Sequence, residues 1–253
     1  MSGNTLMEAQ GLYKIYDGFV ANSNISFTLK ERELVSIIGP NGAGKSTLFN
    51  MLSGSAQPDR GKLLFKGNDI IGKARHRFVS FGISKSHQIT SLFLDSTVFD
   101  NVFFAIEAPA RALNFWDIQD TRQLQADKIH ELLNTVGLAG KSSTMARMLS
   151  HGEQRSLEIA VALASEPTLL LLDEPTAGMG PQETVQIISL IRKLRERLTI
   201  ALVEHKMKMV MDISDRVLVL HHGELLAQGT PQEIAGNAEV KRVYLGEKHV
   251  IRK

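Results

Sequence analysis

The sequence predicts an α/β fold with a mostly parallel sheet, an antiparallel β subdomain near its start and an inserted helical subdomain. First, the apolar run at residues 34–38 leads directly into a glycine-rich loop and then into helix formers. Second, from Pro167 onward short apolar runs alternate with helical patterns, which is typical of a parallel sheet flanked by helices. Third, residues 91–163 are rich in helix formers, which indicates the helical insertion.

The elements expected before this insertion follow from apolar alternation and from turn residues. Residues 7–15 and 24–29 read as two antiparallel strands joined by a turn at residues 16–18, which contains Asp17 and Gly18. The remaining elements of this part are a buried strand at 34–38, a helix that includes 48–52 and a short strand at 61–67.

Apolar spacing also predicts the elements that follow. The insertion carries helical periodicity at residues 124–136 and a helix at 155–164. The elements expected after it are strands at 168–172, 199–203 and 216–220, with helices at 182–198 and 207–214. We therefore predict a single domain, in which residues 1–90 and 164–253 form the α/β core and residues 91–163 form the helical subdomain.

Length and composition exclude several classes of protein. A chain of 253 residues can bury a substantial core, and it lacks cysteine, which excludes disulfides and thiolate chemistry. A net charge of +2, with acidic and basic residues interspersed, gives no nucleic-acid footprint. No apolar stretch approaches the roughly 18 residues that cross a bilayer, and the N-terminus does not read as a signal peptide. We expect a soluble chain that reaches a membrane only through partners.

Residues 39–46, followed by Thr47, match the pattern G-x-x-x-x-G-K-[S/T] between the strand and the helix. In this pattern, glycines let backbone N–H groups point toward phosphate, and the following helix presents the positive end of its dipole. Lys45 is expected to reach the β- and γ-phosphates, and the Ser46 hydroxyl to coordinate Mg²⁺. An unrelated glycine-rich turn is the alternative, and the strand before it and the helix after it argue against that. The predicted nucleotide-binding residues of this loop are Gly39, Asn41, Gly42, Gly44, Lys45, Ser46 and Thr47.

Two acidic residues, Asp173 and Glu174, follow the apolar run at residues 169–172. A buried parallel strand delivers such carboxylates to the carboxyl edge of the sheet, where ligands of open α/β folds bind. We expect Asp173 to hold Mg²⁺ and Glu174 to orient the water that attacks the γ-phosphate. The alternative is that the two acids lie on a solvated loop without a ligand. The phosphate loop upstream argues against that alternative.

Taken in order, five signals resemble the family of ATP-binding cassette (ABC) ATPases, whose core is a P-loop NTPase fold. These signals are the phosphate loop, Gln88, the segment 149–154, the Asp173-Glu174 pair, and His205 after the run 199–204. The resemblance implies that Gln88 senses Mg²⁺ and γ-phosphate and that His205 contacts the γ-phosphate. Tyr16 lies where the family places an aromatic residue that stacks on adenine, although a core or turn role stays open.

Segment 149–154 resembles the signature loop of that family, and a serine hydroxyl with a glycine N–H at a helix start forms an anion site. The resemblance implies that Ser150, Gly152 and Glu153 contact the nucleotide held by an opposite protomer. Two residues depart from the usual pattern, because His151 and Glu153 replace Gly and Gln. A third departure is Gly180, where many members carry an Asp that communicates across the dimer. Its absence puts that communication in doubt.

The chain is similar, within the family, to ATPase subunits of branched-chain amino-acid importers at segments 157–160, 177–184, 207–216, 229–231 and 243–247. This resemblance implies a subunit that hydrolyses Mg²⁺-ATP and pairs with a second ATPase subunit, as a homo- or heterodimer. It also implies two membrane permease subunits, an extracytoplasmic solute-binding protein and a peripheral location at the cytoplasmic face of the inner membrane. Importers of urea or short amides and a lipopolysaccharide-type exporter stay open as alternatives.

Other classes share part of these motifs. A DNA-repair ATPase needs a long coiled coil, a translation-associated ATPase normally has two cassettes, and a nucleotide kinase lacks the signature at 149–154. We therefore expect a transporter subunit with no nucleic-acid partner. The family resemblance implies that residues 89–102 form a groove for a permease helix.

Overall fold

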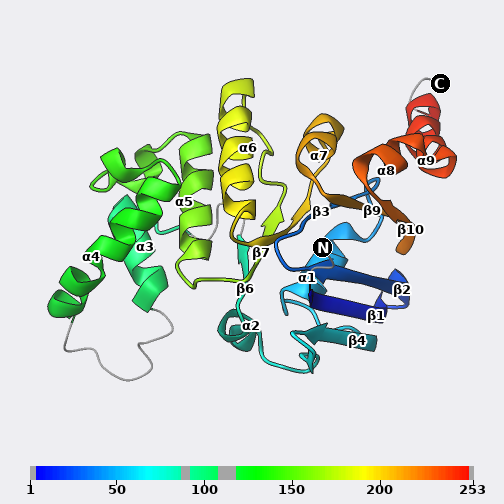
Figure 1. The fold of residues 1–253 in the computed structure, drawn as a ribbon, viewed down its shortest axis with the longest axis horizontal. Coiled ribbons are helices and arrows are strands. Elements are labelled where there is room, and N and C mark those ends of the chain that lie inside the picture. Colours follow the sequence, from blue (N-terminus) through cyan, green and yellow to red (C-terminus); the bar gives the residue numbers. More distant parts are fainter. Residues whose placement is uncertain (1–3, 87–91, 108–117, 251–253) are drawn as a thin grey trace.

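The computed structural model describes residues 4–86, 92–107 and 118–250, and its centre is a six-stranded sheet in the order β10-β9-β3-β8-β7-β6 (Figure 1). Five of these strands are parallel, and β10 pairs with β9 in the antiparallel sense. In chain order the strands are β3 (Leu34–Ile38), β6 (Ile83–Ser86), β7 (Leu169–Asp173), β8 (Thr199–Val203), β9 (Arg216–His221) and β10 (Glu224–Gly229).

The central strands are buried on both faces, which explains their continuous apolar sequences. Every residue of β3 and β8 is buried, as are the four leucines of β7. Alternate residues of β7 serve two different cores. Leu170 and Leu172 pack with the helical part of the chain, whereas Leu169 and Leu171 pack with α1 and the antiparallel sheet.

The antiparallel sheet has the order β2-β1-β4-β5. Asp17 and Gly18 connect its first two strands with φ angles of 47° and 84°, the left-handed backbone that a tight hairpin requires. The strands are β1 (Thr5–Tyr16), β2 (Phe19–Lys30), β4 (Arg60–Phe65) and β5 (Asn68–Asp69).

Helices cover the central sheet, and α3, α4 and α5 group at one end of the molecule, far from α8 and α9 (Figure 1). Buried side chains of α3, α4, α5 and α6 share one hydrophobic core. The helices are α1 (Lys45–Leu52), α2 (Arg75–Phe81), α3 (Val98–Glu107), α4 (Ile118–Thr135), α5 (His151–Leu163), α6 (Pro181–Arg195), α7 (Met207–Ile213), α8 (Pro231–Gly236) and α9 (Ala238–Val250). Among the described residues, the 3₁₀ turns η2 (Ala139–Lys141) and η3 (Ala146–Met148) lie between α4 and α5.

The predicted fold class is confirmed, because the chain combines a mostly parallel sheet, an antiparallel sheet and a group of helices. One helix start is corrected: α5 begins at His151 rather than at residue 155, because the Ser150 side chain caps it. The division of the chain at residues 90/91 and 163/164 stays a prediction. None of the described helices is both long and apolar enough to cross a bilayer.

Candidate functional site

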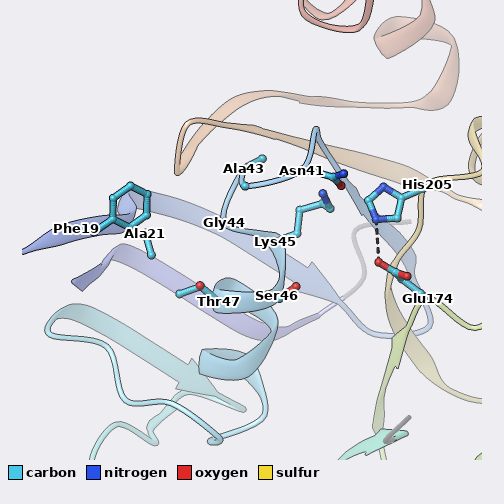
Figure 2. A pocket seen from close by; sticks show the side chains of 11 residues that line it. Phe19, Ala21, Asn41, Ala43, Gly44, Lys45, Ser46, Thr47, Glu174 and His205 are labelled. Atoms are coloured by element: carbon cyan, nitrogen blue, oxygen red, sulfur yellow. Dashed lines mark hydrogen bonds and ion pairs between the residues drawn. The ribbon is translucent and has the colours of Figure 1, made fainter. Parts of the chain in front are cut away.

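Three neighbouring strands deliver their following loops to one edge of the central sheet. Because β3, β8 and β7 are adjacent and parallel, the segments after Ile38, Val203 and Asp173 emerge side by side. They enclose part of a pocket of about 270 Å³, shown in Figure 2. Its lining consists of Phe19, Ala21, Asn41, Gly42, Ala43, Gly44, Lys45, Ser46, Thr47, Glu174 and His205.

The loop between β3 and α1 depends on glycine at two places where the backbone passes close to other chain segments. Gly44 has φ 90°, and a Cβ atom there would lie 2.4 Å from the carbonyl oxygen of Ala21. A Cβ atom on Gly39 would lie 2.3 Å from the carbonyl oxygen of Leu220. No side chain fits these positions without moving backbone, so the shape of the loop is fixed by its sequence.

Lys45 is the first residue of α1, and its side chain folds back over the loop. The Nζ atom donates to the carbonyl oxygens of Gly39 and Pro40 at 2.7 Å each, and the residue is 6% exposed. The ammonium and the start of α1 thus place positive charge at the pocket, where an anion is stabilised. The loop can accept a phosphate group to which Lys45 turns.

A carboxylate and an imidazole lie side by side at one side of the pocket, beside the phosphate loop (Figure 2). Glu174 Oε1 and His205 Nε2 lie 2.8 Å apart, and both side chains are partly exposed. Glu174 has φ 45°, a strained backbone for a residue with a side chain, and its N–H donates to the carbonyl oxygen of Val203. This pair can hold and orient a water molecule beside a bound phosphate.

The loop that carries His205 is fixed by the buried carboxylate of Glu204. Its Oε2 atom accepts from the backbone N–H groups of His205 at 2.7 Å and Lys206 at 3.1 Å. Its Oε1 atom accepts from the backbone N–H and hydroxyl of Thr176, two residues after Glu174. One buried acid therefore connects the two loops that present His205 and Glu174.

Asp173 ends β7 with its carboxylate 3.3 Å from the Nζ atom of Lys85. Its carbonyl oxygen accepts from the guanidinium of Arg155 in α5. The side chains of Asp173 and Ser46 supply a carboxylate and a hydroxyl oxygen, which fit Mg²⁺, an ion usually held by one or two carboxylates together with substrate phosphates. Lys85 supplies a positive charge beside the same carboxylate.

The start of α5 carries a second constellation, apart from the pocket lining. Ser150 accepts from the N–H of Glu153 and closes a capping box with that residue, whose other carboxylate oxygen pairs with Lys141 at 2.5 Å. The hydrogen bond from Lys141, followed by that from the Ser150 N–H, holds the pKa of Glu153 below its ordinary value. The imidazole of His151 lies 3.3 Å from the carbonyl oxygen of Ala177.

The carboxylate of Glu183, from α6, lies directly on this helix start. Its Oε1 atom accepts from the Ser150 hydroxyl at 3.1 Å and from the Gly152 N–H at 3.0 Å. Its Oε2 atom accepts from the Gly180 N–H at 3.3 Å. These hydrogen bonds, with those from the two backbone N–H groups as the largest, hold the pKa of Glu183 below its ordinary value.

Comparison with known proteins identifies the family. The family model described as "ABC transporter" matches residues 22–177. The high-affinity branched-chain amino acid transport ATP-binding protein LivG of Salmonella typhimurium (strain LT2) is 39% identical over 250 residues, which cover 96% of this chain and 98% of that protein. The chain belongs to the ABC transporter family.

Further comparisons place this ABC ATPase more closely. A model described as "Branched-chain amino acid ATP-binding cassette transporter" matches residues 224–250. The lipopolysaccharide export system ATP-binding protein LptB of Haemophilus influenzae is 34% identical, over 96% of this chain and 98% of that protein. A solved ATP-binding cassette of an ABC transporter in its ADP conformation superposes with a TM-score of 0.85 at 24% identity, covering 96% and 99% of the two chains, and shows the fold. Members of this family bind and hydrolyse ATP, and this chain is an ATPase.

The pocket of the ABC ATPase brings together most of the residues that sequence analysis expected there, but not all of them. Gly39, which begins the loop, and Asp173, which ends β7, are not among the residues that line the pocket. Tyr16 is not among the lining residues, whereas Phe19 is; the role given to Tyr16 stays a prediction. Gln88 lies outside the described residues. The expected residues that line the pocket are Asn41, Gly42, Gly44, Lys45, Ser46, Thr47, Glu174 and His205.

Four residues of this ABC ATPase were missed by sequence reasoning. Phe19 and Ala21 lie two apart on β2 and share one face, a signal that the period of a strand could have supplied. Glu204 directly follows an apolar strand, as Asp173 does, so the same pattern marks it. Glu183 carries no such signal, because its contacts depend on how α5 and α6 pack.

Proposed function

We propose that this chain is the ATP-hydrolysing subunit of an importer for branched-chain or related amino acids. The observation that carries the ATPase chemistry is that one pocket brings Glu174 and His205 to the phosphate loop and its Lys45. The similarity to LivG over nearly the whole chain, together with the C-terminal match at residues 224–250, supports the substrate class.

The phosphate end of ATP binds at the loop before α1. Lys45 leaves the carbonyl oxygens of Gly39 and Pro40 and donates to the β- and γ-phosphates, while loop N–H groups hold the remaining oxygens. Ser46 and Asp173 would hold Mg²⁺, together with Gln88 as the family resemblance implies. An ion held by these side chains would supply positive charge to offset the charge that develops on the phosphate oxygens.

Glu174 orients and polarises the attacking water, and His205 is the catalytic group that contacts the γ-phosphate. The hydrogen bond of 2.8 Å between the two side chains keeps both at the mouth of the phosphate loop. Glu204 is a positioning residue, since it fixes the backbone of His205 and reaches Thr176 beyond Glu174. Phosphoryl transfer to water relies mainly on such positioning and on charge neutralisation.

Two copies of the cassette, or this chain and a sister subunit, close over the nucleotide. Ser150 and Gly152 are not part of the pocket that contains the phosphate loop, so within one chain the two constellations are separate. A facing protomer supplies its α5 start to the γ-phosphate on this loop. Closing and opening of this pair drives the permease subunits.

The adenine ring stacks on an aromatic residue near the hairpin between β1 and β2. Phe19 lines the pocket and is 68% exposed, which leaves its ring free for a planar ligand. Tyr16 is 44% exposed, and Lys14 Nζ lies 5.2 Å from the centre of its ring. Phe19 therefore supports this role better than Tyr16.

The permease subunits dock on an exposed aromatic surface of the helical part, formed by Phe93, Leu94 and Phe104. The rings of Phe93 and Phe104 meet edge to face at 5.4 Å, and these side chains are 58% and 39% exposed. Leu92 is 8% exposed and belongs to the core, so a charge at that position tests folding rather than docking. Docking there places the subunit at the cytoplasmic face of the inner membrane, with a solute-binding protein on the opposite side.

The replacement Glu174→Gln tests the proposed activity. It keeps side-chain volume and a hydrogen-bond acceptor for His205, so ATP binding should be retained, while loss of the general base should lower kcat by about 10²–10⁴-fold. The matched control Glu196→Gln changes an exposed glutamate at the end of α6 and should leave kcat unchanged. An unchanged kcat in Glu174→Gln contradicts the assignment.

A lipopolysaccharide-type exporter is the second candidate, because LptB is 34% identical over almost the whole chain. Importers of urea or short amides form a third. Two experiments separate these functions. The chain is first purified with its permeases, and uptake of labelled leucine or urea is then compared in cells with and without the chain. Uptake of leucine that requires the chain supports the proposal, and lipopolysaccharide accumulation without it supports export.

A further inference from the structure

The anion site at the start of α5 is already filled by a side chain of the same protein. Glu183 Oε1 accepts hydrogen bonds from the Ser150 hydroxyl at 3.1 Å and from the Gly152 N–H at 3.0 Å. A carboxylate oxygen between a hydroxyl and a helix N–H has the charge and the acceptor geometry of a phosphoryl oxygen. Glu183 thus occupies the position for which the facing nucleotide competes.

The fit is close. A Cβ atom on Gly152 would lie 3.0 Å from Cβ, Cγ and Oε1 of Glu183, so the absence of a side chain at Gly152 lets the acid approach. The other oxygen, Oε2, stays on the N–H of Gly180 at the start of α6. Turning Oε1 away would therefore break the contacts to α5 and leave the α6 contact available.

We propose that Glu183 is a positioning residue that blocks the start of α5 in the separated subunit and must leave it before the γ-phosphate of a facing nucleotide binds. This inference rests on the proposed nucleotide-sandwiched pair. Ser150 Oγ has one proton and the Gly152 nitrogen has one hydrogen, so neither can serve both anions fully. Because Glu183 makes these contacts only in the separated subunit, it stabilises that state relative to the closed pair. The affinity of the closed pair for ATP is therefore lowered.

The experiment measures how much Mg²⁺-ATP is needed to pair subunits that cannot hydrolyse it. Glu183→Ala and Glu183→Gln are each placed in the Glu174→Gln chain, and the dimer fraction is followed by analytical ultracentrifugation as ATP is raised. Losing a hydrogen bond to a charged group changes an equilibrium constant by about tenfold. The ATP concentration at which half of the protein is dimeric should therefore be about tenfold lower for Glu183→Ala. Glu183→Gln, which keeps an acceptor but no charge, should fall between.

The matched control is Glu233→Ala. Glu233 closes the capping box of α8 with Thr230, at the same helix position as Glu183 in α6, and does not contact α5. Its removal should leave the ATP midpoint of pairing unchanged. Affinity of the monomer for a fluorescent ATP analogue should be equal in all variants, since Glu183 does not line the pocket.

The direction of the shift separates the outcomes. A merely structural role would destabilise the pair and raise the ATP midpoint, so an unchanged or raised midpoint in Glu183→Ala overturns the inference while the sandwich survives. If the Glu174→Gln chain forms no ATP-dependent dimer with or without Glu183, the sandwich fails and the inference falls with it.

Discussion

Replacing Gly44 with alanine should destabilise the nucleotide-free protein more than the same replacement at Gly42. Both glycines have left-handed φ angles, 90° and 78°, so both replacements carry a backbone cost of about 1–2 kcal/mol. A Cβ atom on Gly42 meets nothing within 4 Å. A Cβ atom on Gly44 would lie 2.4 Å from both the Ala21 carbonyl oxygen and the side-chain Nδ2 atom of Asn22. Such overpacking adds about 1–3 kcal/mol.

Urea unfolding followed by circular dichroism measures the difference. The free energy of unfolding should fall by about 1–2 kcal/mol for Gly42→Ala and by about 2–5 kcal/mol for Gly44→Ala. Equal m-values in the three proteins are the control that the denatured state is unchanged. Equal losses at the two positions, or a larger loss at Gly42, would show that the close approach of β2 to the phosphate loop is not what requires glycine at position 44.

Three further predictions test charge, docking and acid sensitivity. Lys45→Ala should weaken ATP binding about 10- to 100-fold in calorimetry, because charge-assisted hydrogen bonds to phosphate are lost; full affinity would refute the role of the lysine. Phe93→Asp should prevent co-purification with the permease subunits, whereas Val185→Asp, at a residue 66% exposed on α6, should not; recovery of both complexes would exclude the proposed docking surface. The depressed pKa of Glu153 contributes stability above its ordinary value of 4.5 that is lost as the pH falls through the folded pKa, so Glu153→Gln should lose less stability on acidification below 4.5 than the wild type. A parallel decline of both proteins in urea titrations across that range would contradict the shift.

Much of the fold was predictable because its central strands are short, apolar and bounded by turn residues. The strands at residues 34–38 and 199–203 match the prediction residue by residue, since both are buried on both faces. The start of α5 was placed too late because Ser150 looked like part of a loop, whereas its side chain caps the helix directly before His151. β10 and α8 were not predicted, because the partly exposed strand and the short helix give weak periodicity.

The candidate site was predictable where chemistry and spacing coincide in a local motif. The phosphate loop and Glu174 follow directly from their strands, so reading the strand was enough to place them. Phe19 and Glu183 depend on contacts between distant segments: the face that β2 turns to the phosphate loop, and the packing of α6 against α5. Such contacts are set by tertiary packing and leave no fixed spacing in the sequence.

The position of His205 follows from the order of strands in the sheet. Along the chain β3, β7 and β8 come in that sequence, but in space β8 lies between β3 and β7. The loop that follows β8 therefore emerges between the phosphate loop and Glu174, which brings the imidazole to both. Glu204 then fixes this arrangement, because a single buried carboxylate accepts from the backbone on either side. Glu204 thus joins the loop of His205 to Thr176, in the segment that leads from β7 into α6, where Glu183 holds the start of α5.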